Sequence, residues 1–175
     1  DPDDIIDQYG ADTARWFVLS DSPPERDLLW TESGIEGAWR FTQRVWRLVT
    51  EAIDDLPKTT DMPTDISASS KTLSKASHKT IEAITADIEG LHFNKAVARM
   101  YEFANSISTG AEGEGAGFAL REALETLVKL IGPMMPHLAE ELWSELGHDR
   151  LLVDEPWPKA DPSLVVDDSV RIAVQ

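Results

Sequence analysis

The sequence has no cysteine, so it forms no disulfide and offers no thiolate to a metal. It also has no apolar run near the ~18 residues of a membrane-spanning helix, and no signal peptide at its start. Basic residues are few, since 16 Lys and Arg stand against 32 Asp and Glu and leave a formal net charge of -16. These absences predict a cytoplasmic domain without a membrane contact. So acidic a body would also repel the phosphates of a nucleic acid.

What is present fits a single globular domain, with or without a small appendage. The chain has 175 residues, of which 42% are hydrophobic and 6 are Trp. This length and composition allow a buried core and exclude disorder. The first residue is Asp1 rather than Met, so we expect a fragment of a longer protein, and we expect the fragment to be monomeric.

Apolar residues recur at steps of three and four along most of the chain, which is the α-helical period. A loop rich in Pro, Thr, Asp and Ser is expected over 57–70, and a flexible glycine-rich break over 110–115. Residues 27–30 read as extended, and residues 170–174 as a strand. The fold class predicted is mainly α, a helical bundle with small α/β pieces at both ends. The expected helices span about 2–9, 11–19, 32–56, 71–89, 94–108, 118–131 and 137–146.

No catalytic site is evident. His137, Glu140 and Glu141 share one helix face, but no second His stands at a metal-binding spacing, so we expect no metal there. The alternative is structural: the three residues lie near the start of a helix, where acidic side chains suit the positive end of the helix dipole. The glycine-rich break lacks the strand, the helix and the Lys of a phosphate-binding loop, and no Ser has a nucleophile context.

The most informative segment is Ala38–Thr50, which contains no acid and three arginines. Arg40, Arg44 and Arg47 are spaced i, i+4, i+7, so they form one stripe beside an apolar stripe of the same helix. Such a stripe suits contacts with a sugar–phosphate backbone. The alternative is that Asp and Glu of neighbouring helices neutralise it. Trp39 and Trp46 are expected to be packing residues rather than stacking partners of bases.

Four short motifs resemble the class I aminoacyl-tRNA synthetases for Leu, Ile, Val and Met. Residues 10–15 read GADTAR, similar to the GADxxR element that follows the catalytic domain of those enzymes. The runs FNKAV at 93–97 and PHLAEELW at 136–143 are similar to two marks of their helical anticodon-binding fold. Trp157-Pro158 with Asp161 resembles the WPxxD tail of that fold.

A longer stretch narrows the resemblance to leucyl-tRNA synthetases. SPPERDL at 22–28, GIEGA at 34–38 and the run from Arg40 to Leu48 resemble the SPPExDLEW…GVEGAxRFLxRVWRL run of that family. Leu29 stands where the family usually has Glu, and Thr42 where it usually has Leu.

The resemblance implies an ATP-dependent ligase that charges tRNA(Leu) with leucine. It makes this chain the anticodon-binding-fold domain, with Arg40, Arg44 and Arg47 as the tRNA-binding candidates. Catalytic residues, and ATP with Mg, belong to other parts of the parent enzyme, so the fragment alone is expected to be inactive. Leucyl members generally do not read the anticodon, so here the fold would grip the tRNA core and corner.

The resemblance also implies a division of the chain. Residues 1–30 would connect to the catalytic domain just after its Lys-Met-Ser-Lys-Ser loop. Residues 31–150 would form the bundle, and residues 151–175 a Pro-rich tail with the first strand of a C-terminal domain. The catalytic and C-terminal domains would be partners within the parent chain. Two alternatives remain, an acidic helical protein-interaction domain without an RNA role, and the same domain of a Met, Val or Ile synthetase.

Overall fold

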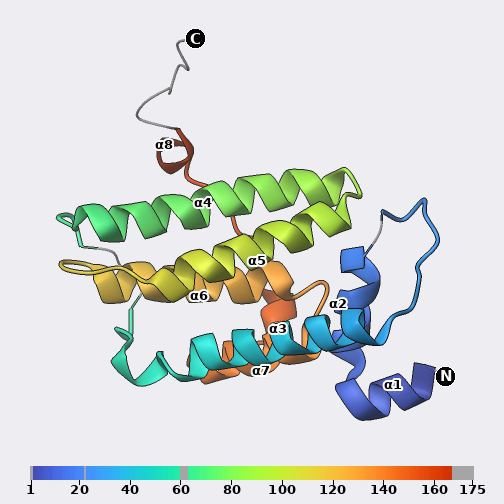
Figure 1. The fold of residues 1–175 in the computed structure, drawn as a ribbon. Coiled ribbons are helices and arrows are strands. Elements are labelled where there is room, and N and C mark those ends of the chain that lie inside the picture. The colour runs from blue at the N-terminus through green and yellow to red at the C-terminus, as the bar shows by residue number, and fades with distance from the viewer. Residues whose placement is uncertain (1, 22, 60–62, 167–175) are drawn as a thin grey trace, which may run out of the picture.

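In a computed structural model, residues 2–21, 23–59 and 63–166 are described, and they form helices joined by short loops without a strand (Figure 1). The predicted mainly α bundle is therefore confirmed. The strand expected over 170–174 lies outside the described residues, and residues 27–30 are irregular. The elements are α1 Pro2–Tyr9, α2 Ala11–Asp21, α3 Glu32–Thr50, η1 Ile53–Asp55, α4 Ala68–Glu89, α5 Phe93–Thr109, α6 Ala116–Ile131, α7 Pro136–Glu145, η2 Leu152–Asp154 and α8 Pro162–Val165, where η marks a 3-10 helix.

Two helix boundaries differ from the sequence prediction by three residues or more. The long helix α3 ends at Thr50 rather than near Leu56, and a turn and the short η1 follow. Helix α4 begins at Ala68, three residues before the predicted start. Its cap is Ser67, whose hydroxyl accepts a hydrogen bond from the Ser70 amide at 3.1 Å. A Ser at this position satisfies an amide that the first helical turn leaves unpaired.

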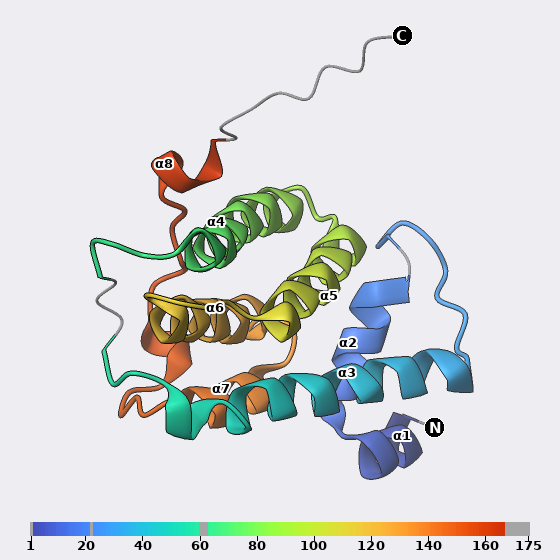
Figure 2. The same ribbon diagram turned by 60° about the vertical axis from the view of Figure 1, so that its left-hand side comes forward.

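Helices α4, α5 and α6 lie side by side, α3 and α7 lie below them in Figure 1, and α2 crosses at one end of this bundle (Figure 1). Helix α4 packs against α5 and α6, and α6 also packs against α7. Helix α3 contacts α2, α5 and α7. This leaves α3 at the outside of the bundle, with one long side free of other helices (Figure 2).

The core is centred on α6, whose side chains Leu124, Leu127, Leu130 and Ile131 are fully buried. At the end where α2 crosses, an aromatic cluster joins three helices. Trp16 of α2 is fully buried and stacks on Phe41 of α3, with ring centroids 4.8 Å apart. The Trp16 indole N–H donates to the Tyr101 hydroxyl of α5 at 3.2 Å. Residues of the 1–30 segment therefore share one core with the bundle.

The contact between α2 and α3 requires a glycine at position 34. A Cβ built on Gly34 would overlap the Phe17 ring and lie 2.8 Å from the Thr31 hydroxyl oxygen. Neither neighbour is free to move, because Phe17 is buried and Thr31 caps α3 through its hydroxyl. The first glycine of the GIEGA run thus lets the two helices approach closely.

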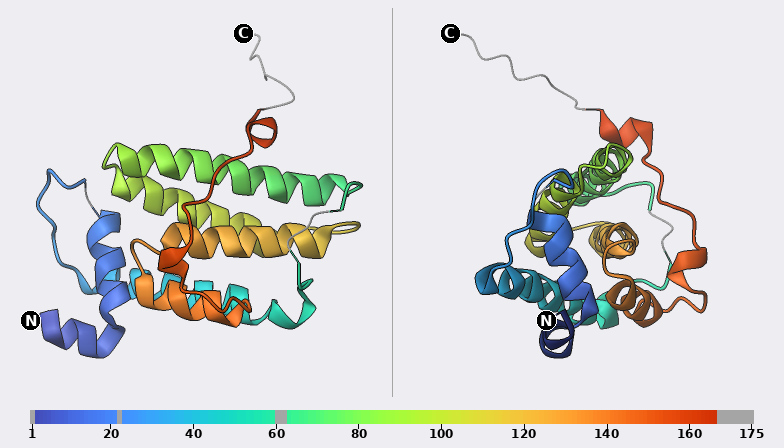
Figure 3. Two further views of the ribbon diagram at one scale, coloured as in Figure 1. Left: turned by 180° about the vertical axis from the view of Figure 1, so that it is seen from behind. Right: turned by 90° about the vertical axis from the view of Figure 1, so that its right-hand side faces the viewer.

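The segment after α7 is fastened across the back of the bundle up to α4 (Figure 3). The Glu140 carboxylate accepts the amides of Leu152 and Val153 at 2.7 and 2.9 Å. The Trp157 indole N–H donates to the Thr85 hydroxyl of α4 at 2.8 Å. Glu140 of the PHLAEELW run therefore holds the start of this segment, and Trp157 attaches a later part of it to α4.

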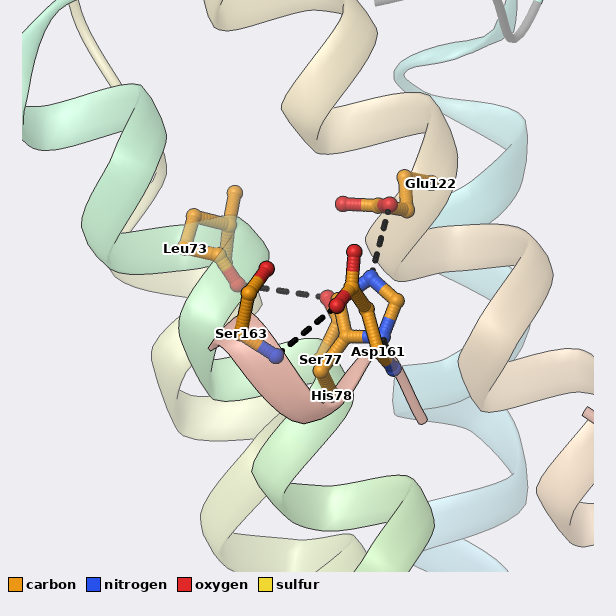
Figure 4. A network of polar contacts seen from close by, with 6 residues as sticks. All are labelled: Leu73, Ser77, His78, Glu122, Asp161 and Ser163. Atoms are coloured by element: carbon orange, nitrogen blue, oxygen red, sulfur yellow. Dashed lines mark hydrogen bonds and ion pairs between the residues drawn. The ribbon is translucent and has the colours of Figure 1, made fainter. Parts of the chain in front are cut away.

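The last anchor is a network around His78 of α4 (Figure 4). Its Nδ1 accepts the Asp161 amide at 2.9 Å, so the ring proton belongs on Nε2, which lies 3.2 Å from the Glu122 carboxylate of α6. Asp161 in turn caps α8 by accepting the Ser163 amide at 2.8 Å. That cap holds the pKa of the Asp161 carboxyl below its ordinary value.

Candidate RNA-binding face

Helix α3 is amphipathic, and its cap fixes where it begins. The Thr31 side chain accepts the Gly34 amide at 3.2 Å while its backbone stays extended, which is the geometry of an N-cap. The apolar stripe expected beside the arginines consists of Ala38, Phe41, Val45, Leu48 and Ala52; the first three are buried, and Leu48 and Ala52 are half-buried. Buried apolar residues of α3 are Ile35, Ala38, Phe41, Val45 and Val49.

The opposite side of α3 is exposed, and we call it the α3 outer face. It consists of Trp39, Arg40, Gln43, Trp46 and Arg47, and the exposed acids Glu32 and Glu36 precede them on the same side of the helix. At roughly 100° per residue, the two arginines fall in one row and the two tryptophans in a second row, with Gln43 between the rows. In each row the two members are seven residues apart, so they lie about 10.5 Å apart along the axis.

Arg44 lies at the edge of this face and is held by α5. One guanidinium nitrogen donates to the Asn105 side-chain oxygen at 2.7 Å. The other donates to the Ala104 carbonyl at 3.0 Å and the Ser108 hydroxyl at 2.8 Å. All three acceptors are neutral, so the bonds fix the side chain without cancelling its charge. The spacing predicts that Arg44 shares a stripe with Arg40. In the structure the Arg44 side chain is instead bonded to α5.

Arg40 and Arg47 are exposed to solvent. Arg40 lies 3.6 Å from Glu36, an acid of its own helix, and the side chains are 65% and 54% exposed. A pair so exposed is worth little, because water and salt screen it. In the part of the chain that the structure describes, no carboxylate forms an ion pair with Arg44 or Arg47. Acids of neighbouring helices therefore do not neutralise the three arginines there.

The Arg40 charge on this face affects the pKa of Tyr101, a residue of α5. Burial raises the pKa of the Tyr101 phenol above its ordinary value of 10.0, while the Trp16 hydrogen bond and the Arg40 charge lower it in part. The phenol packs on Phe41, with ring centroids 4.1 Å apart. The Arg40 charge is thus felt by a group inside the aromatic cluster.

The two tryptophans of the face differ from the sequence expectation. Trp39 and Trp46 were expected to pack, yet they are 41% and 36% exposed. The signal that places them was available in the sequence, because both stand well away from the apolar stripe on a helical projection. Trp16, by contrast, is fully buried.

Asp12 of the GADTAR motif connects two helices. The Asp12 carboxylate of α2 accepts the Leu138 amide in the first turn of α7 at 2.7 Å and pairs with Arg15 at 2.7 Å. The residue at the N-cap of α7, Met135, makes no side-chain cap bond. Asp12 therefore caps α7 from another helix, which links the GADxxR and PHLAEELW motifs.

The residues considered for a metal have other roles. The exposed His137 lies 3.4 Å from Asp12, Glu140 holds the segment after α7, and Glu141 is exposed. Over residues 2–21, 23–59 and 63–166, no three His, Asp or Glu side chains gather in a way that would hold a metal ion. In the same ranges no helix has the length and apolarity needed to cross a membrane.

An open apolar groove of about 780 Å³ runs along α1, α2 and the irregular segment before α3. Its walls include Ile6, Val18 and Trp30, which are 43%, 49% and 42% exposed. Among the described residues that line it, the only charged side chain is that of Arg15, and its guanidinium is paired with Asp12. The groove therefore suits contact with another apolar surface rather than with a polar ligand.

Known proteins similar to this chain agree on one family. The chain is 61% identical over its full length to a leucine–tRNA ligase of Parvibaculum lavamentivorans, and 53% identical to one of Paramagnetospirillum magneticum. It spans 20% of the length of each of these relatives. The LeuRS of Agrobacterium radiobacter K84 agnB2, solved in a ternary complex with tRNA and LeuAMS, matches 95% of the chain with a TM-score of 0.86 and 29% identity. The match covers 22% of that LeuRS.

A more distant structure shares the fold. Methionyl-tRNA synthetase of Mycobacterium tuberculosis matches 93% of this chain and 39% of its own, with a TM-score of 0.62 and 17% identity. Residues 70–175 match the family model described as the anticodon-binding domain of tRNA ligase. On this match, which covers more than half of the chain, the chain belongs to the family of anticodon-binding domains of tRNA ligases.

Proposed function

We propose that this chain is the tRNA-gripping helical domain of a leucine–tRNA ligase, an enzyme that joins leucine to tRNA(Leu) with ATP and Mg. The high identity to leucine ligases over the whole chain supports leucine over Met, Val or Ile, and over a protein-interaction domain without an RNA role. The sequence holds no phosphate-binding loop, so ATP and Mg would be held elsewhere in the parent enzyme. The parent would act in the cytoplasm.

The observation that carries the RNA role is the charge of Arg40, Arg44 and Arg47. Arg44 is oriented by three neutral acceptors, and the other two point into solvent. Three cations spaced along one helix match successive phosphates of a strand, and a guanidinium can meet a phosphate with two hydrogen bonds. Their contribution to the slope of log affinity on log salt would be roughly -2 to -3.

The proposal divides the chain into three parts. Residues 1–30 would connect to the catalytic domain, with the apolar groove beside α1 and α2 facing it. Residues 31–150 would form the tRNA-gripping bundle, and residues 151–175 would lead into the C-terminal domain. An apolar groove is consistent with a chain that spans a fifth of the length of its relatives. We expect the chain alone to be monomeric and inactive.

The test separates RNA docking from catalysis in the full-length ligase that carries this segment. Arg40→Ala with Arg47→Ala removes two exposed cations that make no hydrogen bond to another helix. We expect ATP–pyrophosphate exchange to remain unchanged, because it needs no tRNA. Charging should weaken by about 10-fold or more, since each charge-assisted contact is worth about 1 to 2 kcal/mol. The salt slope should become less steep by about 1.5 to 2.

Two further variants complete the test. Arg26→Ala with Arg150→Ala removes two exposed arginines elsewhere and should leave charging unchanged. Arg44→Ala also removes the bonds to α5, so it should lower stability as well as charging, whereas Arg44→Lys keeps the charge. Unchanged charging in the Arg40 and Arg47 double variant would refute the RNA role of the face. A fall in both exchange and charging would show that these arginines maintain the fold instead.

A further inference from the structure

The α3 outer face carries more than cations. Trp39 and Trp46 are 41% and 36% exposed although each has a large apolar ring system, and they flank the arginine row along the same two turns of helix. The exposed apolar side chains of Leu29 and Trp30 lie nearby in sequence but belong to the segment before α3. A charged row beside an aromatic row is an arrangement that a purely electrostatic contact does not require.

We propose that Trp39 and Trp46 each stack on an unpaired tRNA base, while Arg40 and Arg47 bind the sugar–phosphate backbone beside those bases. This inference rests on the proposed tRNA-binding function of the face. Exposed aromatic rings next to a cationic track are the usual means by which proteins hold unstacked nucleotides. Stacking needs no sequence-specific hydrogen bond, because every base presents a π face.

The spacing on the helix defines the kind of RNA that fits. The two indoles are about 10.5 Å apart along the axis, from seven residues at 1.5 Å each. Neighbouring stacked bases of a strand are only about 3.4 Å apart along the axis of a duplex. The two bases are therefore not stacked neighbours, and the strand on this face has been opened. A loop or a tertiary junction of the tRNA meets this condition, whereas a regular stem does not.

Charge complementarity favours RNA over a protein partner at this face. An apolar protein surface would have to bury Arg40, Gln43 and Arg47 together with the indoles, and burying charge without a partner is costly. An RNA strand supplies phosphates for the arginines and bases for the indoles at once. The residue between the two rows, Gln43, has both donor and acceptor groups for a ribose hydroxyl or a base edge.

The experiment compares substitutions that keep or remove the ring, in the full-length ligase that carries this segment. Trp39→Leu with Trp46→Leu keeps apolar bulk and removes the π faces, whereas Trp39→Phe with Trp46→Phe keeps an aromatic ring at both positions. Affinity for a leucine tRNA transcript is measured over a salt series. The Leu pair should bind about 10-fold more weakly or worse, with an unchanged salt slope, and the Phe pair should retain most of the affinity. ATP–pyrophosphate exchange should stay at the wild-type level.

The control is Val153→Ala, because Val153 is an apolar residue that is 77% exposed and lies in η2, outside both α3 and the apolar groove. Its affinity should equal that of wild type, and an equal loss there would overturn the stacking inference. Chemical probing of the tRNA adds a direct readout, since unpaired bases protected by the wild type should become reactive with the Leu pair. If the Leu pair binds normally while the Arg40 and Arg47 variant binds weakly, stacking is refuted and the tRNA function stands. If neither pair weakens binding, both are refuted.

Discussion

The link between α2 and α7 gives the sharpest prediction about stability. Asp12 is 8% exposed, and its carboxylate accepts the Leu138 amide at 2.7 Å, where Met135 gives no side-chain cap. Asp12→Ala removes a charged acceptor from a helix N-terminus and leaves that amide unpaired. A lost cap costs about 1 kcal/mol and a bond to a charged group about 1.5 to 3 kcal/mol, so we expect a loss of about 2 to 3 kcal/mol. That corresponds to a fall of roughly 5 to 10 °C in Tm for a chain of this size.

The measurement is urea unfolding followed by circular dichroism, with three companion variants. Asp12→Asn keeps an oxygen for the Leu138 amide and loses the charge, so it should cost about half as much. Arg15→Ala should cost under about 1 kcal/mol, because that side chain is 46% exposed. Glu141→Ala removes an exposed acid of α7 and should be neutral within about 0.5 kcal/mol. If Asp12→Ala is as stable as Glu141→Ala, Asp12 does not cap α7.

Two further predictions concern the contacts of α2 and α5 with α3. Gly34→Ala should destabilise by about 1 to 3 kcal/mol because its Cβ meets Phe17. Gly37→Ala, where only the Arg40 guanidinium lies at 3.8 Å, should stabilise by up to about 1 kcal/mol, and equal effects in thermal melts would contradict the close approach. Tyr101 should ionise above pH 10 in an ultraviolet absorbance titration, with Tyr101→Phe as the reference. Because its folded pKa is raised, its contribution to stability is complete below pH 10 and disappears as pH rises through the folded value, and Arg40→Ala should raise that pKa further.

Much of the fold was predictable because its signals are local. Helical periodicity, Gly and Pro place most helix boundaries within a few residues, since caps and breakers act within one turn. The end of α3 was missed because apolar residues continue to Leu56, and periodicity cannot distinguish a helix from a turn followed by a 3-10 helix. The early start of α4 depends on the Ser67 cap, which looked like one more polar residue of a loop.

The candidate site was predictable only in part, because its decisive contacts are long-range. Sequence spacing finds the row of Arg40, Arg44 and Arg47, but it cannot show that Arg44 bonds to Ala104, about sixty residues later. The same limit applies to Asp12, whose partner Leu138 lies 126 positions away. Contacts between residues so far apart in the sequence produce no periodic pattern in it. The resemblance to leucyl-tRNA synthetases identified the motif residues, and only the structure shows that several of them connect helices.

The strongest objection to an RNA-binding role is the net charge of -16, and distance resolves it. At about 0.1 M salt the Debye length is about 10 Å, so acids on the far side of the bundle are largely screened at the α3 outer face. A phosphate at that face is affected first by Arg40, Arg44 and Arg47, and the acid described next to them is Glu36. The segment Ala38–Thr50 spans about 20 Å of helix without an acid, so the local field there is positive. In the proposed complex the acidic body would add to specificity, because a strand displaced from α3 would meet negative charge and be repelled.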